Sequence, residues 1–129
     1  MNGSLTGQQF ELIGQLHMNL EISGNAYREY LQGGKTFMFA KILRQYNEKI
    51  RELIIEKGWL LPESLQKDAL ALVLHYDAWM QKWDELKAKL DPSPDDEFVF
   101  PNSVTFPKEA ARNIEQEHER LKQLFANAG

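Results

Sequence analysis

The stretch PESLQKDALALVLHYDAWMQKWDELKAKL, residues 62–90, decides the fold class, because it contains no glycine and no proline after its first residue. Its apolar and aromatic side chains recur at alternating steps of four and three residues, which is the spacing that places them on one face of an α-helix. That face needs other helices to cover it, so the stretch predicts one long helix in a helical bundle. The repeating positions are Leu65, Ala69, Leu72, Tyr76, Trp79, Trp83, Leu86 and Leu90.

The same spacing predicts two helices before this one. The first begins near Thr6, where Thr6 and Gln9 have the pattern of a capping box, and its inward positions are Phe10, Ile13, His17, Leu20, Gly24, Tyr27 and Leu31. The second covers residues 36–57, and Gly58 is well placed to be its left-handed C-terminal cap. Its inward positions are predicted to be Phe39, Leu43, Tyr46, Ile50 and Leu53.

Residues 91–107 differ from the rest, because four prolines and four acidic residues interrupt the helical spacing. Phe98, Phe100 and Phe106 make this segment too apolar for a free linker, so we expect an ordered arm packed on the helices. Residues 97–106 could pair as a short hairpin. A fourth helix then begins at Pro107, with Ala111, Ile114, His118, Leu121 and Phe125 facing inward.

The sequence therefore predicts one all-α domain over residues 1–129. We expect a four-helix up-down bundle, with a long Pro-rich acidic and aromatic arm between the third and fourth helices. A chain of 129 residues is large enough to bury such a core without a disulfide or a structural metal.

Composition narrows the class of protein. The net charge of −4 is accounted for by the arm, through Asp91, Asp95, Asp96 and Glu97, and the remaining acidic and basic residues balance. A neutral body lacks the basic face that displaces counterions from phosphates, so nucleic acid is not an expected partner. There is no cysteine and no apolar run of the ~20 residues that span a bilayer. We expect a cytoplasmic protein without a membrane span, and thiol chemistry is excluded.

Arg112-Asn113, followed by four residues and then His118, resembles the signature of the HEPN ribonucleases, which are small four-helix proteins. The resemblance implies RNA cleavage in a cleft at a dimer interface, with His118 as the general acid–base and Arg112 holding the phosphate. The helical repeat opposes this, because ~100° per residue places these two side chains about 120° apart. An RNA-cleaving enzyme is therefore kept as an alternative function.

The three histidines suggest a second alternative, a metal site. His17, His75 and His118 lie on the first, third and fourth predicted helices, within roughly 8 Å of one another along the bundle axis at 1.5 Å per residue. Three imidazoles suit zinc, with Glu21 or Glu115 as a further ligand. The competing interpretation is three separate histidines bonded to neighbouring groups, and on that interpretation no cofactor is expected.

Our main interpretation is a non-catalytic interaction or accessory protein. The aromatic row Tyr76, Trp79 and Trp83 is typical of core packing, and the wall of a small-molecule cavity is the alternative use of these rings. The apolar arm is the unusual surface. We therefore expect a protein partner, either another protein or a second copy in a homodimer, to contact Phe98, Phe100 and Phe106.

Overall fold

The computed structural model describes residues 5–128, and this part of the chain contains four α-helices and no β-strand. They are α1 (Leu5–Gln32), α2 (Phe37–Lys57), α3 (Glu63–Leu90) and α4 (Lys108–Ala128), with a short 3₁₀ turn at Gly58–Leu60. The all-α prediction is confirmed. Among these helices, none is both long enough and apolar enough to cross a membrane.

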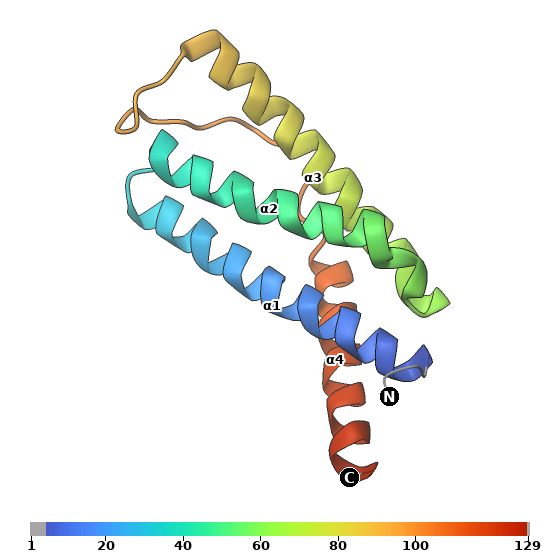
Figure 1. The fold of residues 1–129 in the computed structure, drawn as a ribbon. Coiled ribbons are helices and arrows are strands. Elements are labelled where there is room, and N and C mark those ends of the chain that lie inside the picture. The colour runs from blue at the N-terminus through green and yellow to red at the C-terminus, as the bar shows by residue number, and fades with distance from the viewer. Residues whose placement is uncertain (1–4, 129) are drawn as a thin grey trace.

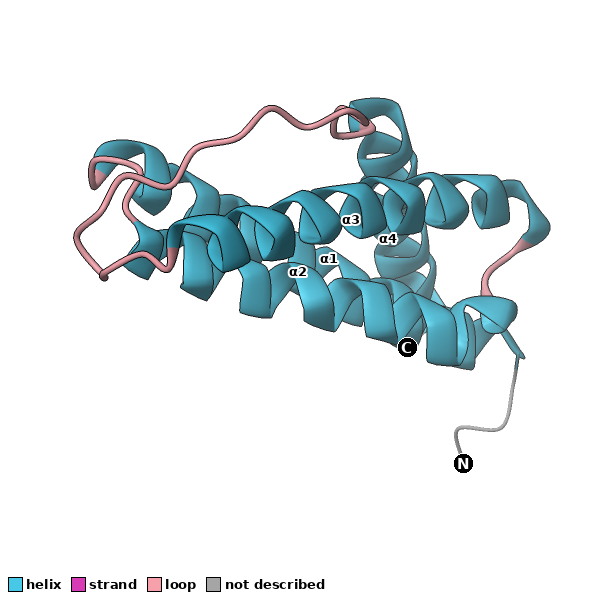
Figure 2. Cartoon of the chain, turned by 90° about the horizontal axis from the view of Figure 1, so that it is seen from above, coloured by secondary structure: helices cyan, strands magenta, loops and turns pink. Residues whose placement is uncertain are grey.

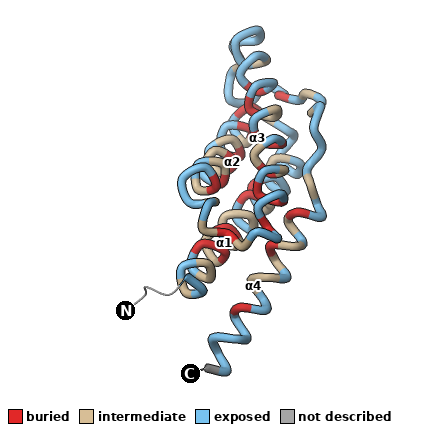
Figure 3. Tube along the Cα trace, turned by 90° about the vertical axis from the view of Figure 1, so that its right-hand side faces the viewer, coloured by how far each residue is buried: buried red, intermediate tan, exposed pale blue. Residues whose placement is uncertain are grey.

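The first three helices lie alongside one another, and the fourth crosses them (Figure 1). α1 packs on α2 and α4, and α3 packs on the same two helices. Figure 1 shows α4 at a steep angle to α1, and its C-terminal end projects past the other helices. Figure 3 shows that this projecting end is exposed. Because of the crossing, the up-down arrangement remains a prediction.

The main core draws side chains from all four helices. Tyr76 and Leu72, in the middle of α3, are 2% and 0% exposed. The repeating positions predicted for α3 are buried from Leu65 to Trp83, with the exception of Trp79, which is half-buried. Leu90, at the end of the helix, is half exposed. The largest fully buried partners of this core are Leu12, Ile13, Leu16, Ile50, Ile114 and Leu121.

Residues 33–35 form a tight turn between α1 and α2. A side chain on Gly33 would place a Cβ 2.3 Å from the Phe39 ring, so only glycine fits there. Gly34 and Lys35 have φ angles of 86° and 56°, the left-handed region that costs a lysine about 1 kcal/mol or more. The carbonyl of Lys35 accepts the N–H of Phe98 at 2.8 Å, so the arm stabilises this unfavourable backbone conformation.

The arm at residues 91–107 caps the start of α2. The N–H groups of Phe37 and Met38 donate to the carbonyls of Asp96 and Pro94, at 2.8 and 3.0 Å. First-turn N–H groups have no partner within their own helix, and the side chain of Thr36 makes no capping bond. The arm therefore does what an N-cap side chain does elsewhere. Figure 2 shows the arm running back beside α3 to reach α4.

Phe98 fixes the arm between α2 and α3. It is fully buried, and its ring lies 5.1 Å from that of Phe37 and 5.2 Å from that of Trp83. Its carbonyl accepts a hydrogen bond from the Tyr30 hydroxyl. Together with Ala40, these rings form a second, smaller core at the α2 start and α3 end.

One local prediction differs from the structure, and the structure also answers the question of the hairpin that the sequence left open. Gly58 has a φ of −59°, so it is right-handed and leads into the 3₁₀ turn rather than forming a left-handed cap. Residues 97–106 form no hairpin; Glu97 instead makes an isolated bridge with Thr36. The reason is that the backbone groups of Phe98, which a hairpin would need, are already bonded to Lys35 and to the Tyr30 hydroxyl.

Replacement of Phe98 by alanine should destabilise the protein by about 3–5 kcal/mol, because it leaves a cavity where a whole buried ring was packed. Urea unfolding followed by circular dichroism measures this. Val99→Ala is the matched control, since Val99 is 49% exposed and its loss should change stability by no more than about 0.5 kcal/mol. Equal effects of the two substitutions would contradict the docked position of the arm.

Candidate functional site

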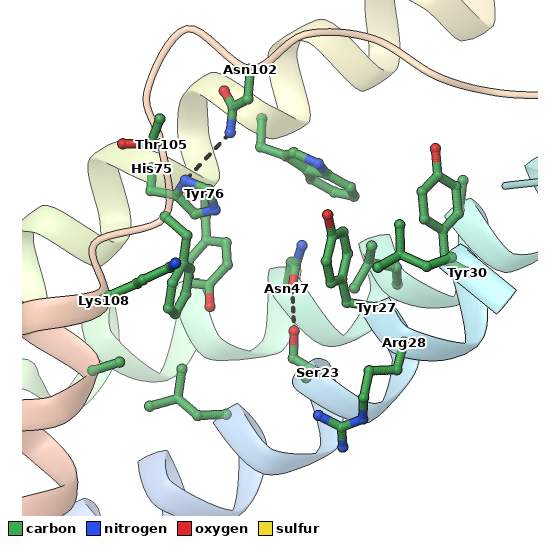
Figure 4. Close-up of a pocket in the computed structure, with 18 of the residues that line it drawn as sticks. Ser23, Tyr27, Arg28, Tyr30, Asn47, His75, Tyr76, Asn102, Thr105 and Lys108 are labelled. Carbon is green, nitrogen blue, oxygen red and sulfur yellow. Dashed lines mark hydrogen bonds between the residues drawn. The ribbon is translucent and has the colours of Figure 1, made fainter.

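A cavity of about 870 Å³ lies between α1, α2, α3, the arm and the first turns of α4 (Figure 4). It borders both cores, because Tyr76 of the main core and Phe98 of the smaller core both line it. Trp79 and Phe100, whose ring centroids are 5.8 Å apart, form part of its aromatic wall. Of the predicted aromatic row, Tyr76 and Trp79 therefore face this space, whereas Trp83 packs in the smaller core.

The cavity exists because the apolar face of α1, formed by its predicted inward positions, is longer than the part of it that other helices pack against. In the first half of this face Ile13 is fully buried, and the rings of Phe10 and His17 contact Phe125 and His118 of α4. The second half continues with the same spacing through Leu20, Gly24, Tyr27 and Leu31, and all four line the cavity. Tyr27 is 50% exposed and Leu31 is 42% exposed. Part of a core-forming face is thus left only partly covered by the described chain.

Three hydrogen-bonding groups point into this apolar space. Ser23 donates to the Asn47 carbonyl oxygen at 2.6 Å, and Figure 4 shows the Asn47 amide nitrogen turned towards the cavity. The Tyr76 hydroxyl also points inward, and burial raises its pKa, so it keeps its proton and acts as a donor. Within residues 5–128 neither this hydroxyl nor the Asn47 nitrogen has a hydrogen-bond partner.

Cations outnumber free acids around the cavity. Arg28, Lys35 and Lys108 line it, and none of the three is ion-paired with an acidic side chain of the described residues. Of the two lining acids, Glu115 is engaged by His17, which leaves Glu21. Lys108 lies in the first turn of α4, where the helix dipole disfavours a positive charge, and Figure 4 shows it reaching into the cavity. The site therefore favours an anionic group.

His75 ties the arm to α3 beside the cavity. Its Nδ1 lies 2.9 Å from the Val104 carbonyl, which assigns the proton to this nitrogen, and its ring forms a T-shaped pair with that of Phe106. The side-chain nitrogen of Asn102 lies 3.3 Å from the same Nδ1. Burial lowers the pKa of His75, although the carbonyls of Val104 and Thr105 partly offset this effect. A neutral His75 is therefore part of the arm's attachment.

The structure brings two of the three histidines together and leaves the third apart. His17 and His118 stack with their ring centroids 4.3 Å apart and their planes 11° from parallel. Glu115 joins them, because the Nδ1 of His17 lies 2.7 and 2.8 Å from its two carboxylate oxygens. His75 is held under the arm and takes no part in this cluster. The metal set His17, His75 and His118 is thus not assembled in this conformation.

The HEPN-like residues are also not gathered at one point. Arg112 is exposed and paired with Glu109 at 2.9 Å, whereas Asn113 donates to Asp68 at 3.2 Å. His118 lies against the His17 ring instead. The RNA-cleaving alternative therefore gains no support from the geometry.

The three arm phenylalanines have different surroundings. Phe98 is fully buried, Phe100 is partly buried against the Trp79 ring, and Phe106 is 39% exposed. Sequence reasoning named none of the polar cavity residues Ser23, Asn47 and Lys108 as functional. The available signal was the pair Ser23-Gly24 in the middle of a core-forming helix, where small side chains leave space.

No protein-family model matches the sequence, and comparison with curated proteins and with solved structures gave no match either.

Acid should loosen the arm, because the pKa of His75 is lower in the folded protein than its ordinary value of 6.5. As the pH falls below 6.5, the His75 side chain takes up a proton in the unfolded chain before it does so in the folded protein. The stability due to neutral His75 is therefore fully present above pH 6.5 and is lost as the pH falls further. The difference in unfolding free energy between the native protein and His75→Asn, measured in urea, should be constant above about pH 7 and shrink towards pH 5. A difference that stays constant over this whole range would refute the assignment.

Proposed function

We propose that the protein is a non-catalytic binding protein whose cavity holds a small amphipathic anion, such as an acyl or aromatic carboxylate. The observation that carries this proposal is the second half of the apolar face of α1. Leu20, Gly24, Tyr27 and Leu31 have the spacing of core residues, yet all four line a cavity, and Tyr27 and Leu31 remain 50% and 42% exposed. Burial of apolar surface of this kind contributes about 25 cal/mol per Å², so an apolar guest would be stabilised there.

The polar groups of the cavity support an anionic end on that guest. Lys108, Arg28 and Lys35 supply positive charge, and the Tyr76 hydroxyl and the Asn47 amide supply unpaired donors within the described chain. Small-molecule sites typically combine an apolar lining with a few such polar groups, in volumes of roughly 300–1,000 Å³. A cavity of about 870 Å³ lies within this range. The cytoplasmic location expected from the sequence stays part of the proposal.

Gly24→Leu should abolish binding without harming the fold. A Cβ at Gly24 meets only the end of the Arg28 side chain, at 3.7 Å, so the leucine would extend into the cavity. The probe is dodecanoate, titrated while the total tryptophan fluorescence is followed, because Trp79, one of the three tryptophans, lines the cavity. Gly14→Leu is the matched control, because Gly14 is also inside α1, would have nothing within 4 Å of an added Cβ and is not a lining residue. Both leucines should favour the helix by up to about 1 kcal/mol.

The anion preference has its own variant within the same experiment. Lys108→Met roughly keeps the length of the side chain and removes its charge. Loss of one partly exposed charge interaction costs about 1 kcal/mol, so dodecanoate binding should weaken by about 5–10-fold. Binding of the uncharged dodecanol should be unchanged. Dodecanoate binding that survives Gly24→Leu, or that is absent from the native protein, would reject the cavity as its site.

We also propose self-association. The sequence placed the partner contact on Phe98, Phe100 and Phe106, but Phe98 is buried, so the surface proposed is instead an apolar pair on the outside of α3. Leu70 and Leu74 lie one turn apart and are 58% and 55% exposed. The mass in solution, measured by light scattering at increasing concentration, should approach that of a dimer. Leu70→Glu with Leu74→Glu should return it to that of a monomer, while Glu63→Gln on the same helix should leave it unchanged. A monomeric native protein would exclude this surface as a dimer interface.

A further inference from the structure

The two stacked histidines and the carboxylate beside them form a cluster between α1 and α4, next to the cavity that Glu115 also lines. We propose that His17, Glu115 and His118 bind one divalent transition-metal ion of the zinc class, joining α1 to α4. One potential ligand atom from each of the three residues can be chosen so that all three lie within 4.8 Å of one another. Among the described residues this is the group of histidine and acidic side chains found close enough to share an ion.

The residue types and their placement suit such an ion. Imidazole nitrogen and carboxylate oxygen are common zinc ligands, and three protein ligands leave a position open for water or another ligand. Glu115 and His118 are three residues apart, so they lie on one face of α4, and His17 approaches this face from α1. The side chains of His17 and Glu115 are 24% and 45% exposed, so an ion can reach the cluster from solvent.

His118 provides the strongest indication. Its Nδ1 is buried and has no hydrogen-bond partner among the described residues. A buried polar atom left unpaired typically costs about 1–3 kcal/mol. His17 differs, because its Nδ1 faces the Glu115 carboxylate and its other nitrogen remains available. A metal ion would give the orphaned nitrogen of His118 a partner.

Binding requires a small rearrangement of the two rings. The lone pair of an imidazole nitrogen lies in the ring plane, so rings stacked 4.3 Å apart and nearly parallel do not direct their lone pairs at one point. Zinc–nitrogen distances are about 2.0–2.1 Å, and rotation of the side chains would have to bring the three donors closer than in the stacked arrangement. Loss of the His17–His118 stacking is therefore part of the proposal.

The experiment uses the full chain without an affinity tag, titrated with Co²⁺ and then with Zn²⁺. We expect one Co²⁺ per chain, with the intense visible absorption of a four-coordinate ion, displaced by Zn²⁺. Zn²⁺ should also raise the melting temperature, because the ion binds only the folded arrangement. His118→Phe keeps a ring against Phe10 and His17. Loss of a group that only supports a metal ligand weakens metal binding by up to about 100-fold. Loss of the ligand His118 itself should therefore weaken Co²⁺ binding by more than this.

Two further variants keep the test decisive if His118→Phe does not fold. Glu115→Gln keeps the size of the side chain and should weaken binding and alter the visible spectrum. Glu119→Gln removes an exposed carboxylate one turn along the same helix and should change neither. The proposal is overturned if the native protein binds no stoichiometric Co²⁺, or if binding is unchanged in both His118→Phe and Glu115→Gln. Dodecanoate binding is measured separately, so failure at the cluster leaves the cavity proposal standing.

Discussion

The N–H groups at the start of α2 impose the constraint on which the rest of the structure depends. They have no partner in their own helix, and Thr36 does not cap them. The carbonyls of Pro94 and Asp96 accept them, and this places the beginning of the arm on α2. Burial of Phe98 then fixes the arm between α2 and α3, and His75 holds its later part. The chain between these attachments borders the cavity.

The position of α4 explains why a cavity remains. α4 crosses α1 and covers only the first half of its apolar face, and the arm is too thin to fill the space beyond. Tyr27 and Leu31 are left facing this space, with Lys108 at its edge. Glu115 belongs both to the cavity lining and to the histidine cluster. The two proposed sites are therefore neighbours, although each rests on different atoms.

The sequence predicts the helices well, because apolar residues spaced three and four apart directly indicate one helix face that must be buried. It predicts their inward faces less well. On α2 the spacing favoured Tyr46, but the structure buries Asn47, whose side-chain oxygen accepts a hydrogen bond from Ser23. A hydrogen bond between distant residues leaves no periodic signal. The sequence pattern also does not predict that α4 crosses the other helices, because the exposed Leu31 has the same helical spacing as the buried residues of α1. The pairing of His17 with His118 was foreseeable from their positions, whereas the separate role of His75 depends on the path of the arm.

The projecting end of α4 has a consequence for motion. After Leu121, residues 122–127 are exposed, and the stacking of Phe125 on Phe10 is the ring contact that attaches them to α1. A helical segment with so little tertiary cover is held mainly by its own backbone bonds, which are marginal over a few turns. Its amide protons should therefore exchange with solvent deuterium through local fraying, long before those of the buried turns around Ile114.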